Sequence, residues 1–254
     1  CIVNLPGVGE NLIDHPECPL IARANGKYGY YKQGKGWRMI KNGLEFLLFG
    51  TGPVNSTGVE AGAFINPIDQ DELAYIQAFF VPSIYMNSDT IGVIKDDYGM
   101  SITTVMTKPK SRGKVTLKSN DPKDMPVIEL NLLKHPDDLK MMMAGQKFFL
   151  RALQEGALGE KVKEIIIPNT KGLDDDKLAD HCRNFVRTNY HPSGTAKMGA
   201  DNDKMAVLDS KMRVRGIDNL RVCDLSAMPN INSGNTSAPA MMLGLRCGDL
   251  ISNS

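Results

Sequence analysis

The sequence predicts a mixed α+β fold, in which an antiparallel sheet with helices is combined with segments of a separate α/β layer. Several short β-rich runs in the middle of the chain are separated by turn signals, which is typical of antiparallel sheets. Near the end, the apolar run 220–223 stops at Asp224, and the polar loop 230–237 then leads into a helical pattern. A strand, an acid, a loop and a helix in that order are typical of an α/β layer that binds a cofactor.

The predicted strands of the sheet cover four runs that are rich in β-forming residues. They are residues 74–81, 101–106, 114–117 and 127–130. Before them, the segment 4–16 reads N-L-P-G-V-G-E-N-L-I-D-H-P, and its glycines and prolines exclude a regular helix or a central strand. This segment is therefore either an ordered loop or a contact for a cofactor.

Four helices are predicted from apolar residues at helical spacing. They span residues 34–50, 136–153, 174–187 and 238–251. In the second helix, the methionines around Met142 fit core packing better than a binding surface. At the start of the third, the run Asp174-Asp175-Asp176 fits helix capping better than a divalent-ion site.

Composition argues against several classes of partner. Lys plus Arg number 30 and Asp plus Glu number 29, so the charge balance gives no reason to expect a nucleic acid or an anionic membrane. The longest apolar run, near residues 44–49, is much shorter than the roughly 20 residues of a membrane span. Five widely spaced cysteines without a CxxC pair argue against a disulfide framework and favour a reducing, cytoplasmic location. No metal site is expected, because the four histidines are equally scattered.

The first candidate for chemistry is His191, in the run Y-H-P-S-G-T-A-K-M-G at residues 190–199. Pro192 directs the chain out of helical geometry, and the small residues after it allow the backbone to approach a ligand. Such a histidine can act as a general base near neutral pH. Spacing alone nevertheless favours a partly buried histidine that stabilises a turn.

The second candidate is the loop N-S-G-N-T-S at residues 232–237, which precedes the terminal helix. Thr236 or Ser237 can cap that helix, whose amino terminus offers unpaired N–H groups and a partial positive charge. Such a terminus suits a phosphate or the N1–C2 carbonyl edge of a flavin. A capped surface helix without a ligand explains the pattern equally well.

Four segments together resemble the glucose–methanol–choline (GMC) oxidoreductases in order and in spacing. They are residues 4–16, K-P-K-S-R-G-K-V-T-L-K-S at 108–119, residues 190–199, and N-L-R-V-C-D-L-S-A-M-P with S-G-N-T-S-A-P between 219 and 239. The resemblance covers nearly the whole chain and is weakest over residues 26–98. It implies the fold of that family, in which a substrate-binding domain accompanies a Rossmann-like FAD-binding domain.

The resemblance implies FAD as the cofactor and a small-molecule alcohol as the substrate. By position, His191 matches the catalytic base of the family, which accepts the hydroxyl proton while a hydride passes to flavin N5. Asn235 matches the second active-site position, which hydrogen-bonds the substrate oxygen. The cofactor-binding residues that it implies are Asn11, Asp14, His15, Asp224, Asn235 and Thr236.

The resemblance also implies domain boundaries. Residues 1–25 and 190–254 match segments of the FAD-binding domain, and residues 26–189 match the substrate-binding domain. The G-x-G-x-x-G turn that binds the ADP half of FAD is not found, because Gly7-x-Gly9 lacks the third glycine. We therefore expect an amino-terminal FAD-binding half to be a partner of this chain, on the same protein or on another, unless it was lost by truncation. These 254 residues alone should bind FAD weakly or not at all.

Three functional hypotheses are compatible with these residues. The first is an alcohol dehydrogenase or oxidase that passes electrons to dioxygen or to a quinone. The second is a hydroxynitrile lyase, since the same scaffold includes lyases that hold FAD without redox chemistry. The third is a stable fragment without catalysis. Within the first hypothesis, a buried Glu60 could attract a cationic alcohol, although a structural hydrogen-bonding role is favoured for it.

Overall fold

The computed structural model describes residues 3–84 and 97–253, which form two compact units. Unit 1 comprises Cys1–Pro16, Met106–Leu139 and Val186–Ser254. Unit 2 comprises Glu17–Val105 and Lys140–Phe185. Both units combine helices with antiparallel strand pairs, which confirms the predicted mixed class.

These units differ from the predicted boundaries of 1–25, 26–189 and 190–254. Residues 106–139, which the prediction assigns to the substrate-binding domain, belong to the unit that holds both ends of the chain. The reason lies in how the chain crosses between units. The chain passes from one unit to the other inside or at the end of continuous elements, including β4 (Gly99–Met106) and α2 (Pro136–Gln154). No stretch with the composition of a linker therefore marks the boundaries between the units.

Unit 2 is built on a sheet whose strands follow the order β2-β3-β4-β1-β7. The bounds of the strands not yet given are β1 (Pro16–Ala24), β2 (Ala61–Ile65), β3 (Ile76–Val81) and β7 (Val162–Ile167). β1 and β4 are antiparallel, from Glu17 opposite Val105 to Arg23 opposite Gly99. Every residue of β4 is buried, so these two strands form the centre of the unit's core.

β1 is absent from the predicted strands, because Pro16 and Pro19 argue against a central strand. In the structure, Pro19 lies opposite Thr103 of β4, whereas the pairing of β1 with β7 begins only at Ile21. The missing N–H of Pro19 therefore does not interrupt the ladder with β7. β2 and β7 were not predicted either.

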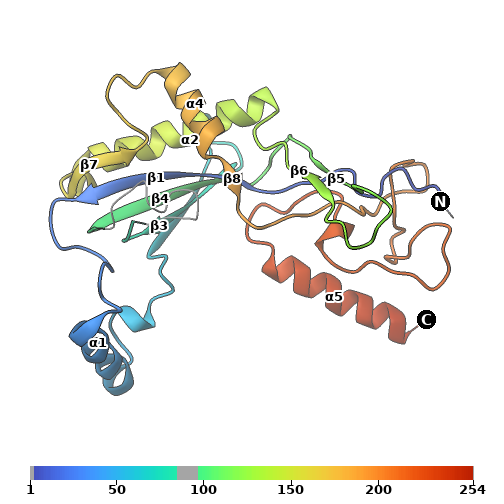
Figure 1. Ribbon diagram of the computed structural model, residues 1–254, viewed down its shortest axis with the longest axis horizontal. Helices are drawn as coiled ribbons and strands as arrows, with labels where there is room; N and C mark the ends of the chain where they lie inside the picture. Colours follow the sequence, from blue (N-terminus) through green and yellow to red (C-terminus); the bar gives the residue numbers. More distant parts are fainter. Residues whose placement is uncertain (1–2, 85–96, 254) are drawn as a thin grey trace. The chain divides into compact units, whose positions relative to one another are not determined.

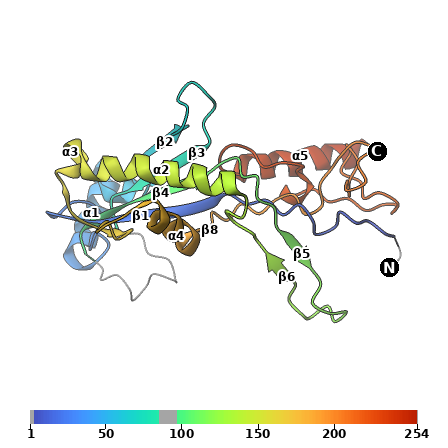
Figure 2. The same ribbon diagram turned by 90° about the horizontal axis from the view of Figure 1, so that it is seen from above.

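Helix α2 lies along one face of this sheet, as the two views in Figure 1 and Figure 2 show. Met142, Gln146 and Leu153 on its inner side are buried, which confirms the predicted core packing for Met142, whereas Met141 and Met143 are half-buried. Gln146 Nε2 donates to the carbonyl oxygen of Cys18 in β1 at 3.0 Å, and this bond ties the helix to the central strand. The other helices are α1 (Gly36–Phe49), η1 (Pro53–Asn55), α3 (Gly156–Gly159) and α4 (Asp175–Phe185).

The predicted capping of the third helix is confirmed at α4. Asp174 precedes its first residue, and Asp174 Oδ1 accepts a hydrogen bond from the Lys177 N–H at 2.9 Å. Asp175 and Asp176 then lie in the first turn, where negative charge stabilises the helix dipole.

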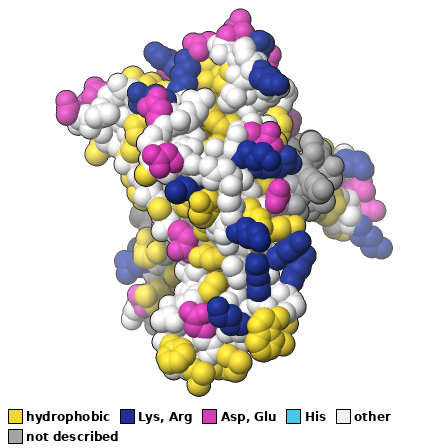
Figure 3. Space-filling model, turned by 90° about the vertical axis from the view of Figure 1, so that its left-hand side faces the viewer, with side chains coloured by type: hydrophobic (Ala, Val, Ile, Leu, Met, Phe, Trp, Pro, Cys, Tyr) yellow, Lys and Arg dark blue, Asp and Glu magenta, His cyan; other side chains and the backbone are white. Residues whose placement is uncertain are grey.

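Helix α1 projects away from the strands of its own unit in Figure 1. It ends as predicted at Gly50, whose φ of 64° and N–H bond to Phe46 are typical of a helix carboxyl terminus. Its apolar side chains are exposed, Trp37 by 72% and Leu47 by 79%. Figure 3 shows hydrophobic, Lys and Arg side chains gathered at the lower end of the view, where α1 lies. Across residues 3–84 and 97–253, no helix has the length and apolarity to cross a membrane.

Unit 1 contains less regular structure. Its elements are β5 (Lys114–Thr116), β6 (Val127–Glu129), β8 (Arg187–Thr188), η2 (Leu225–Ala227) and α5 (Ser237–Ser252). The predicted β5, β6 and terminal helix are confirmed. The predicted strand at 220–223 is wrong, because this segment is held only by isolated bonds such as Val222 N–H to the Met212 carbonyl oxygen and by one bridge between Arg213 and Arg221.

The cysteines require a second correction. Cys223, just before Asp224, forms a disulfide with Cys247 of α5, with Cα atoms 5.9 Å apart. Cys18 and Cys182 are buried and belong to no disulfide, and Cys1 lies outside the described residues. The linear spacing hid this pair because Cys223 and Cys247 meet only when α5 packs beside its preceding segment. The predicted cytoplasmic location rested on unpaired cysteines and loses that support.

Candidate active site

The candidate site lies entirely within unit 1, where the first segment of the chain pairs with the segment around His191. Ile13 and Ser193 exchange two backbone hydrogen bonds of 2.9 and 2.8 Å. Gly9 N–H also donates to the Thr195 carbonyl oxygen at 2.8 Å. The glycine- and proline-rich segment is therefore an ordered loop. In an antiparallel pair of this register, His15 comes opposite His191.

Asp14 holds the backbone turn that carries His191. The ladder departs from regular pairing here, and the His191 N–H donates to Asp14 Oδ1 at 3.0 Å. The Thr188 hydroxyl donates to Asp14 Oδ2, and Tyr190 adopts a φ of 59° between them. A non-glycine residue in this left-handed conformation is uncommon, so the carboxylate contacts maintain a turn that the backbone would not otherwise prefer.

The two histidine rings are in direct contact. Their Nδ1 atoms are 2.9 Å apart, and the rings meet edge to face with centroids separated by 5.0 Å. His15 is fully buried, whereas His191 is partly exposed. On its other side, His15 Nε2 lies 2.9 Å from the carbonyl oxygen of Asn232. The His191 ring is therefore held by His15 through its Nδ1 atom, and its remaining edge is open to solvent.

Burial dominates the electrostatics of this group. It lowers the pKa of His15 to about 4, with a further lowering by His191 and opposing contributions from the carbonyl groups of Asn232 and Thr107. Burial also lowers the pKa of His191, against the charge of Asp14. The pKa of Asp14 is raised by burial despite its hydrogen bonds. Both histidines are consequently neutral at pH 7, which is the state that a general base requires.

Asn232 connects the histidine pair to the predicted loop. Its backbone carbonyl meets His15, and its side-chain Nδ2 donates to the carbonyl oxygens of Gly234 at 2.7 Å and Asn235 at 3.2 Å. The Asn235 side chain is exposed at the end of this loop. The sequence did not single out Thr188, and it singled out Asn232 only as part of the 232–237 loop, because their contacts with Asp14 and His15 join segments more than 170 residues apart.

The amino terminus of α5 differs from the predicted cap. Thr236 is the capping residue by position and is buried, but its side chain makes no capping hydrogen bond. Ala240 N–H bonds the Thr236 carbonyl oxygen at 2.9 Å, as in any first turn. The start of α5 therefore lacks the cap that the Thr236 side chain was predicted to supply.

Asn11 and Asp224 make contacts within the chain. Asn11 accepts from Arg112 Nε at 3.1 Å and donates to the Gly194 carbonyl oxygen at 3.3 Å. Gly194 has a φ of 88°, and a Cβ there would lie 2.5 Å from the Asn11 carbonyl oxygen, so this glycine is needed for the approach of the chain to itself. Asp224 Oδ1 accepts from the N–H and hydroxyl of Ser226 and caps η2. Their roles toward a cofactor stay predictions.

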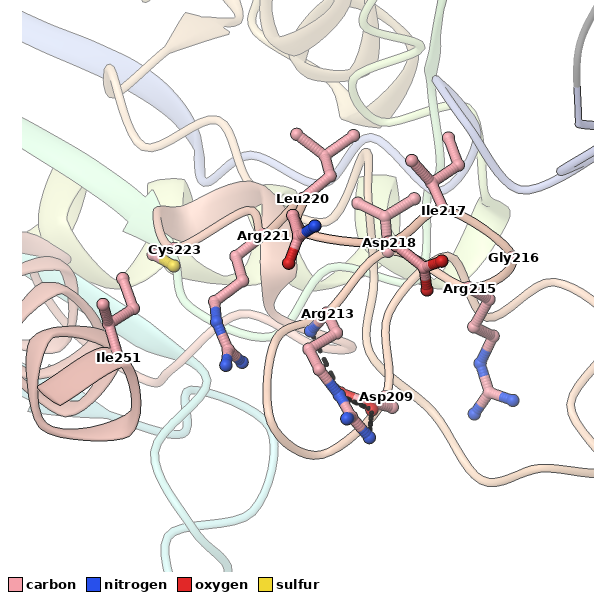
Figure 4. A pocket seen from close by; sticks show the side chains of 12 residues that line it. Asp209, Arg213, Arg215, Gly216, Ile217, Asp218, Leu220, Arg221, Cys223 and Ile251 are labelled. Atoms are coloured by element: carbon pink, nitrogen blue, oxygen red, sulfur yellow. Dashed lines mark hydrogen bonds and ion pairs between the residues drawn. The ribbon is translucent and has the colours of Figure 1, made fainter. Parts of the chain in front are cut away.

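A cavity of about 990 Å³ adjoins the Asp224 segment but does not include His191 or Asn235. In Figure 4, the guanidinium groups of Arg213, Arg215 and Arg221 point in a similar direction along it. Each already has a partner, at 2.7 Å from Asp209 for Arg213, at 3.1 Å from Asp201 for Arg215 and at 2.6 Å from the Lys211 carbonyl for Arg221. These pairs make the cavity a poor candidate for chemistry.

Glu60 takes the structural role that the sequence favours. It accepts hydrogen bonds from the hydroxyl groups of Tyr30 and Ser56, which lower the pKa of its carboxyl group. Glu60 is exposed, so the alternative in which a buried Glu60 attracts a cationic alcohol is wrong. Within residues 3–84 and 97–253, no three His, Cys, Asp or Glu side chains converge as metal ligands.

Comparison with known proteins agrees with the segments that carry the resemblance. A family model described as GMC oxidoreductase matches residues 109–244. The oxygen-dependent choline dehydrogenase of Escherichia coli O157:H7 is 35% identical over 248 residues, which cover 98% of this chain and 43% of that protein. Formate oxidase of Aspergillus oryzae RIB40 superposes with a TM-score of 0.82 at 24% identity, covering 99% of this chain and 48% of the oxidase. An FAD-dependent oxidoreductase of Chaetomium thermophilum has a TM-score of 0.82 at 17% identity, over 99% and 49% of the two chains.

The mixed α/β fold of this chain is thus shared with these solved oxidoreductases. The chain belongs to the GMC oxidoreductase family, which confirms the resemblance. It spans a little under half the length of the curated relatives that it matches.

Proposed function

We propose that this chain provides the proton-accepting part of an FAD-dependent alcohol oxidoreductase, with His191 as the base. The observation that supports this most is the state of His191. Its pKa is lowered by burial, its backbone is fixed by Asp14, and only one of its ring nitrogens contacts His15. A neutral imidazole with one open edge is suited to accept a proton near pH 7.

FAD is the cofactor in this proposal, and when bound it would take up the hydride from the alcohol carbon. The residues that would hold it are Asp224 and the start of α5, with Asn235 and Thr236. Two observations fit this assignment. The Thr236 side chain makes no capping hydrogen bond at the start of α5, and Asn232 Oδ1 is buried without a hydrogen-bond partner among the described residues. A helix amino terminus stabilises a group that gains negative charge.

The residues of the chain act on the alcohol in two ways. His191 accepts the hydroxyl proton, because an alkoxide gives up a hydride more readily than an alcohol. The Asn235 amide donates a hydrogen bond to the same oxygen and stabilises its developing charge. General-base catalysis contributes roughly 10²- to 10⁴-fold to a rate, so His191 is the larger expected contribution.

The proposed activity requires more than this chain. The G-x-G-x-x-G turn is not found in its sequence, and the chain covers 43% of a choline dehydrogenase relative. We therefore assign the binding of the ADP half of FAD to a further amino-terminal segment, as a partner of this chain. Choline and other small primary alcohols are the first substrates to test, since relatives are named oxygen-dependent choline dehydrogenases. Dioxygen and a quinone are the acceptors to compare.

The proposal is tested by flavin reduction without oxygen. The complete FAD-loaded protein and its His191→Ala variant are mixed with a panel of primary alcohols, and flavin bleaching is followed by absorbance. The parent should bleach with at least one alcohol. The variant should retain FAD but lose about 10²-fold or more in the rate of reduction.

His135→Ala is the matched control, because His135 is an exposed histidine of unit 1 outside the site. It should bleach at the rate of the parent. A parent that holds FAD yet is reduced by no alcohol contradicts the proposal and favours the lyase hypothesis, in which the flavin stays oxidised. If the complete protein binds no FAD, the third hypothesis is favoured, in which this chain is stable but has no catalytic activity.

A further inference from the structure

The contact between His15 and His191 has a consequence for the proposed base. We propose that His15 is a positioning residue that fixes the tautomer of His191, so that His191 Nε2 is the atom that accepts the substrate proton. This inference rests on the proposed function of His191. It assigns His15 a role different from the cofactor contact that the family resemblance implies.

The first step concerns the proton on His15 Nε2. This nitrogen lies 2.9 Å from the backbone carbonyl oxygen of Asn232. A carbonyl oxygen can only accept a hydrogen bond, so Nε2 must carry the hydrogen. The tautomer of a histidine is set in this way by the hydrogen bond that one of its nitrogens makes.

The second step concerns His15 Nδ1. His15 is fully buried, and its pKa is lowered to about 4, so the ring is neutral at pH 7. A neutral imidazole carries one hydrogen, and that hydrogen is already on Nε2. His15 Nδ1 therefore presents a lone pair to its neighbour and can only accept.

The third step transfers this constraint to His191. The two Nδ1 atoms are 2.9 Å apart, a normal hydrogen-bond distance that requires one hydrogen between them. Since His15 Nδ1 accepts, His191 Nδ1 must donate. The other tautomer of His191 would face one lone pair with another at this distance. His191 Nε2 is consequently unprotonated and is the free base.

One other polar group near His191 opposes this assignment as it is placed. Asn189 Nδ2 lies 3.4 Å from His191 Nδ1, and an amide nitrogen only donates, but this contact is longer than the one to His15, and a turn of the amide would present its oxygen as a second acceptor for the Nδ1 hydrogen. The Asp14 carboxylate accepts the backbone N–H of His191, and its negative charge raises the pKa of the His191 ring. The carbonyl of Thr107 acts on His15 in the same sense as that of Asn232, favouring N–H on its ring.

The tautomers are measurable by nuclear magnetic resonance without substrate. The sequence has four histidines, so a protein labelled with ¹⁵N only in histidine gives a simple long-range proton–nitrogen spectrum. At pH 7 the purified protein should show His191 protonated at Nδ1 and His15 protonated at Nε2. Assignment comes from the His15→Asn and His191→Ala variants. A proton on His191 Nε2 at pH 7 overturns the inference.

Two variants of His15 separate positioning from structural support. In His15→Asn, the amide oxygen takes the place of Nδ1 and keeps the acceptor for His191. In His15→Gln, the amide takes the place of Nε2 and keeps the donor to Asn232 but loses that acceptor. The rate of flavin reduction should fall about 10-fold or more in His15→Gln relative to His15→Asn, with the substrate KM similar in both, because the His191 Nδ1 hydrogen loses its acceptor only in His15→Gln.

The outcomes distinguish this inference from the proposed function. If His15→Gln retains the parent rate and His15→Asn loses it, His15 supports the Asn232 loop instead, and the inference is wrong. Equal rates in the two variants also refute it. If the spectrum shows the expected tautomers but no alcohol reduces the flavin, the tautomer assignment stands and the alcohol-oxidation proposal fails.

Discussion

At the scale of single residues, Asp14 has the largest number of roles in the site. One carboxylate oxygen accepts the His191 N–H and the other accepts the Thr188 hydroxyl, so a single side chain closes the turn on both sides of Tyr190. Burial raises the pKa of Asp14, whereas these hydrogen bonds favour its charged form. The charge also raises the pKa of His191. Asp14 therefore couples the position of the base to its basicity.

Replacing Asp14 by Asn should separate these two effects. The amide keeps an oxygen that can accept the His191 N–H, but it removes the negative charge. Because that charge raises the pKa of His191, the pKa should fall further below its ordinary value in Asp14→Asn. The measurement is the pH titration of the His191 ring resonances, and the acid limb of the pH profile for flavin reduction should move the same way.

Asp137→Asn is the control for this variant, because Asp137 is an exposed carboxylate of unit 1 that pairs with Lys110. It should leave the titration of His191 unchanged. An upward shift of the His191 midpoint in Asp14→Asn would show that burial changes outweigh the lost charge.

At the scale of elements, the helices and the regular strands were the predictable part. α1, α2, α4 and α5 follow from apolar spacing, and β3 to β6 from β-rich runs. β1 could not be predicted in this way, since it contains Pro16 and Pro19, which precede the start of its pairing with β7 at Ile21. The segment 220–223 looked like a strand from its apolar residues, but strand formation needs a neighbour, and the described residues supply one bridge.

The candidate site was also only partly predictable from the sequence. His191 and its environment in segments 4–16 and 190–199 could be identified from family resemblance, because those motifs are local in sequence. The contacts of Asn232 with His15 and of Thr188 with Asp14 could not, since a pair of distant residues leaves no local pattern. The disulfide between Cys223 and Cys247 was missed for the same reason.

The packing of α2 gives a prediction at this scale. The side chain of Met142 in α2 is fully buried, whereas Met125 is 77% exposed. Met142→Ala should lower the free energy of unfolding by about 2–5 kcal/mol, because it removes buried methylene groups and leaves a cavity. Met125→Ala should change it by less than about 0.5 kcal/mol. Urea unfolding followed by circular dichroism measures both, and similar losses in the two variants would mean that α2 does not pack on the sheet as described.

At the scale of the whole molecule, each unit contains one buried histidine with a strongly lowered pKa. His15 lies in unit 1, and His181 of α4 lies in unit 2, where its Nε2 is 3.5 Å from the Cys18 sulfur. Burial lowers the pKa of each to about 4. In the unfolded chain both return to about 6.5. Acid should therefore act on the two units through the same kind of group.

The sign of this effect follows from proton uptake. Between pH 6.5 and 4, the unfolded chain binds protons at both histidines and the folded chain does not. The free energy of unfolding must then fall as the pH falls through this window. Asp14 acts in the opposite sense, because its raised pKa lets the folded state bind a proton more readily near its own titration range. It offsets only part of the loss, since it is one group against two.

The resulting prediction is a loss of stability on mild acidification, in which His15 and His181 take part together with His191, whose pKa burial also lowers. The free energy of unfolding, measured with urea at several pH values, should be steady above about pH 7 and should fall toward pH 4, with up to about one proton taken up on unfolding at each of His15 and His181 and a further contribution from His191. His181→Gln should reduce that uptake by about one proton while leaving the His15 contribution in unit 1. If the units unfold separately, only the transition of unit 2 should lose its pH dependence in this variant. If the free energy of unfolding of His181→Gln changes with pH as steeply as that of the parent, the prediction is wrong, because His181 would then be protonated equally in the folded and unfolded states.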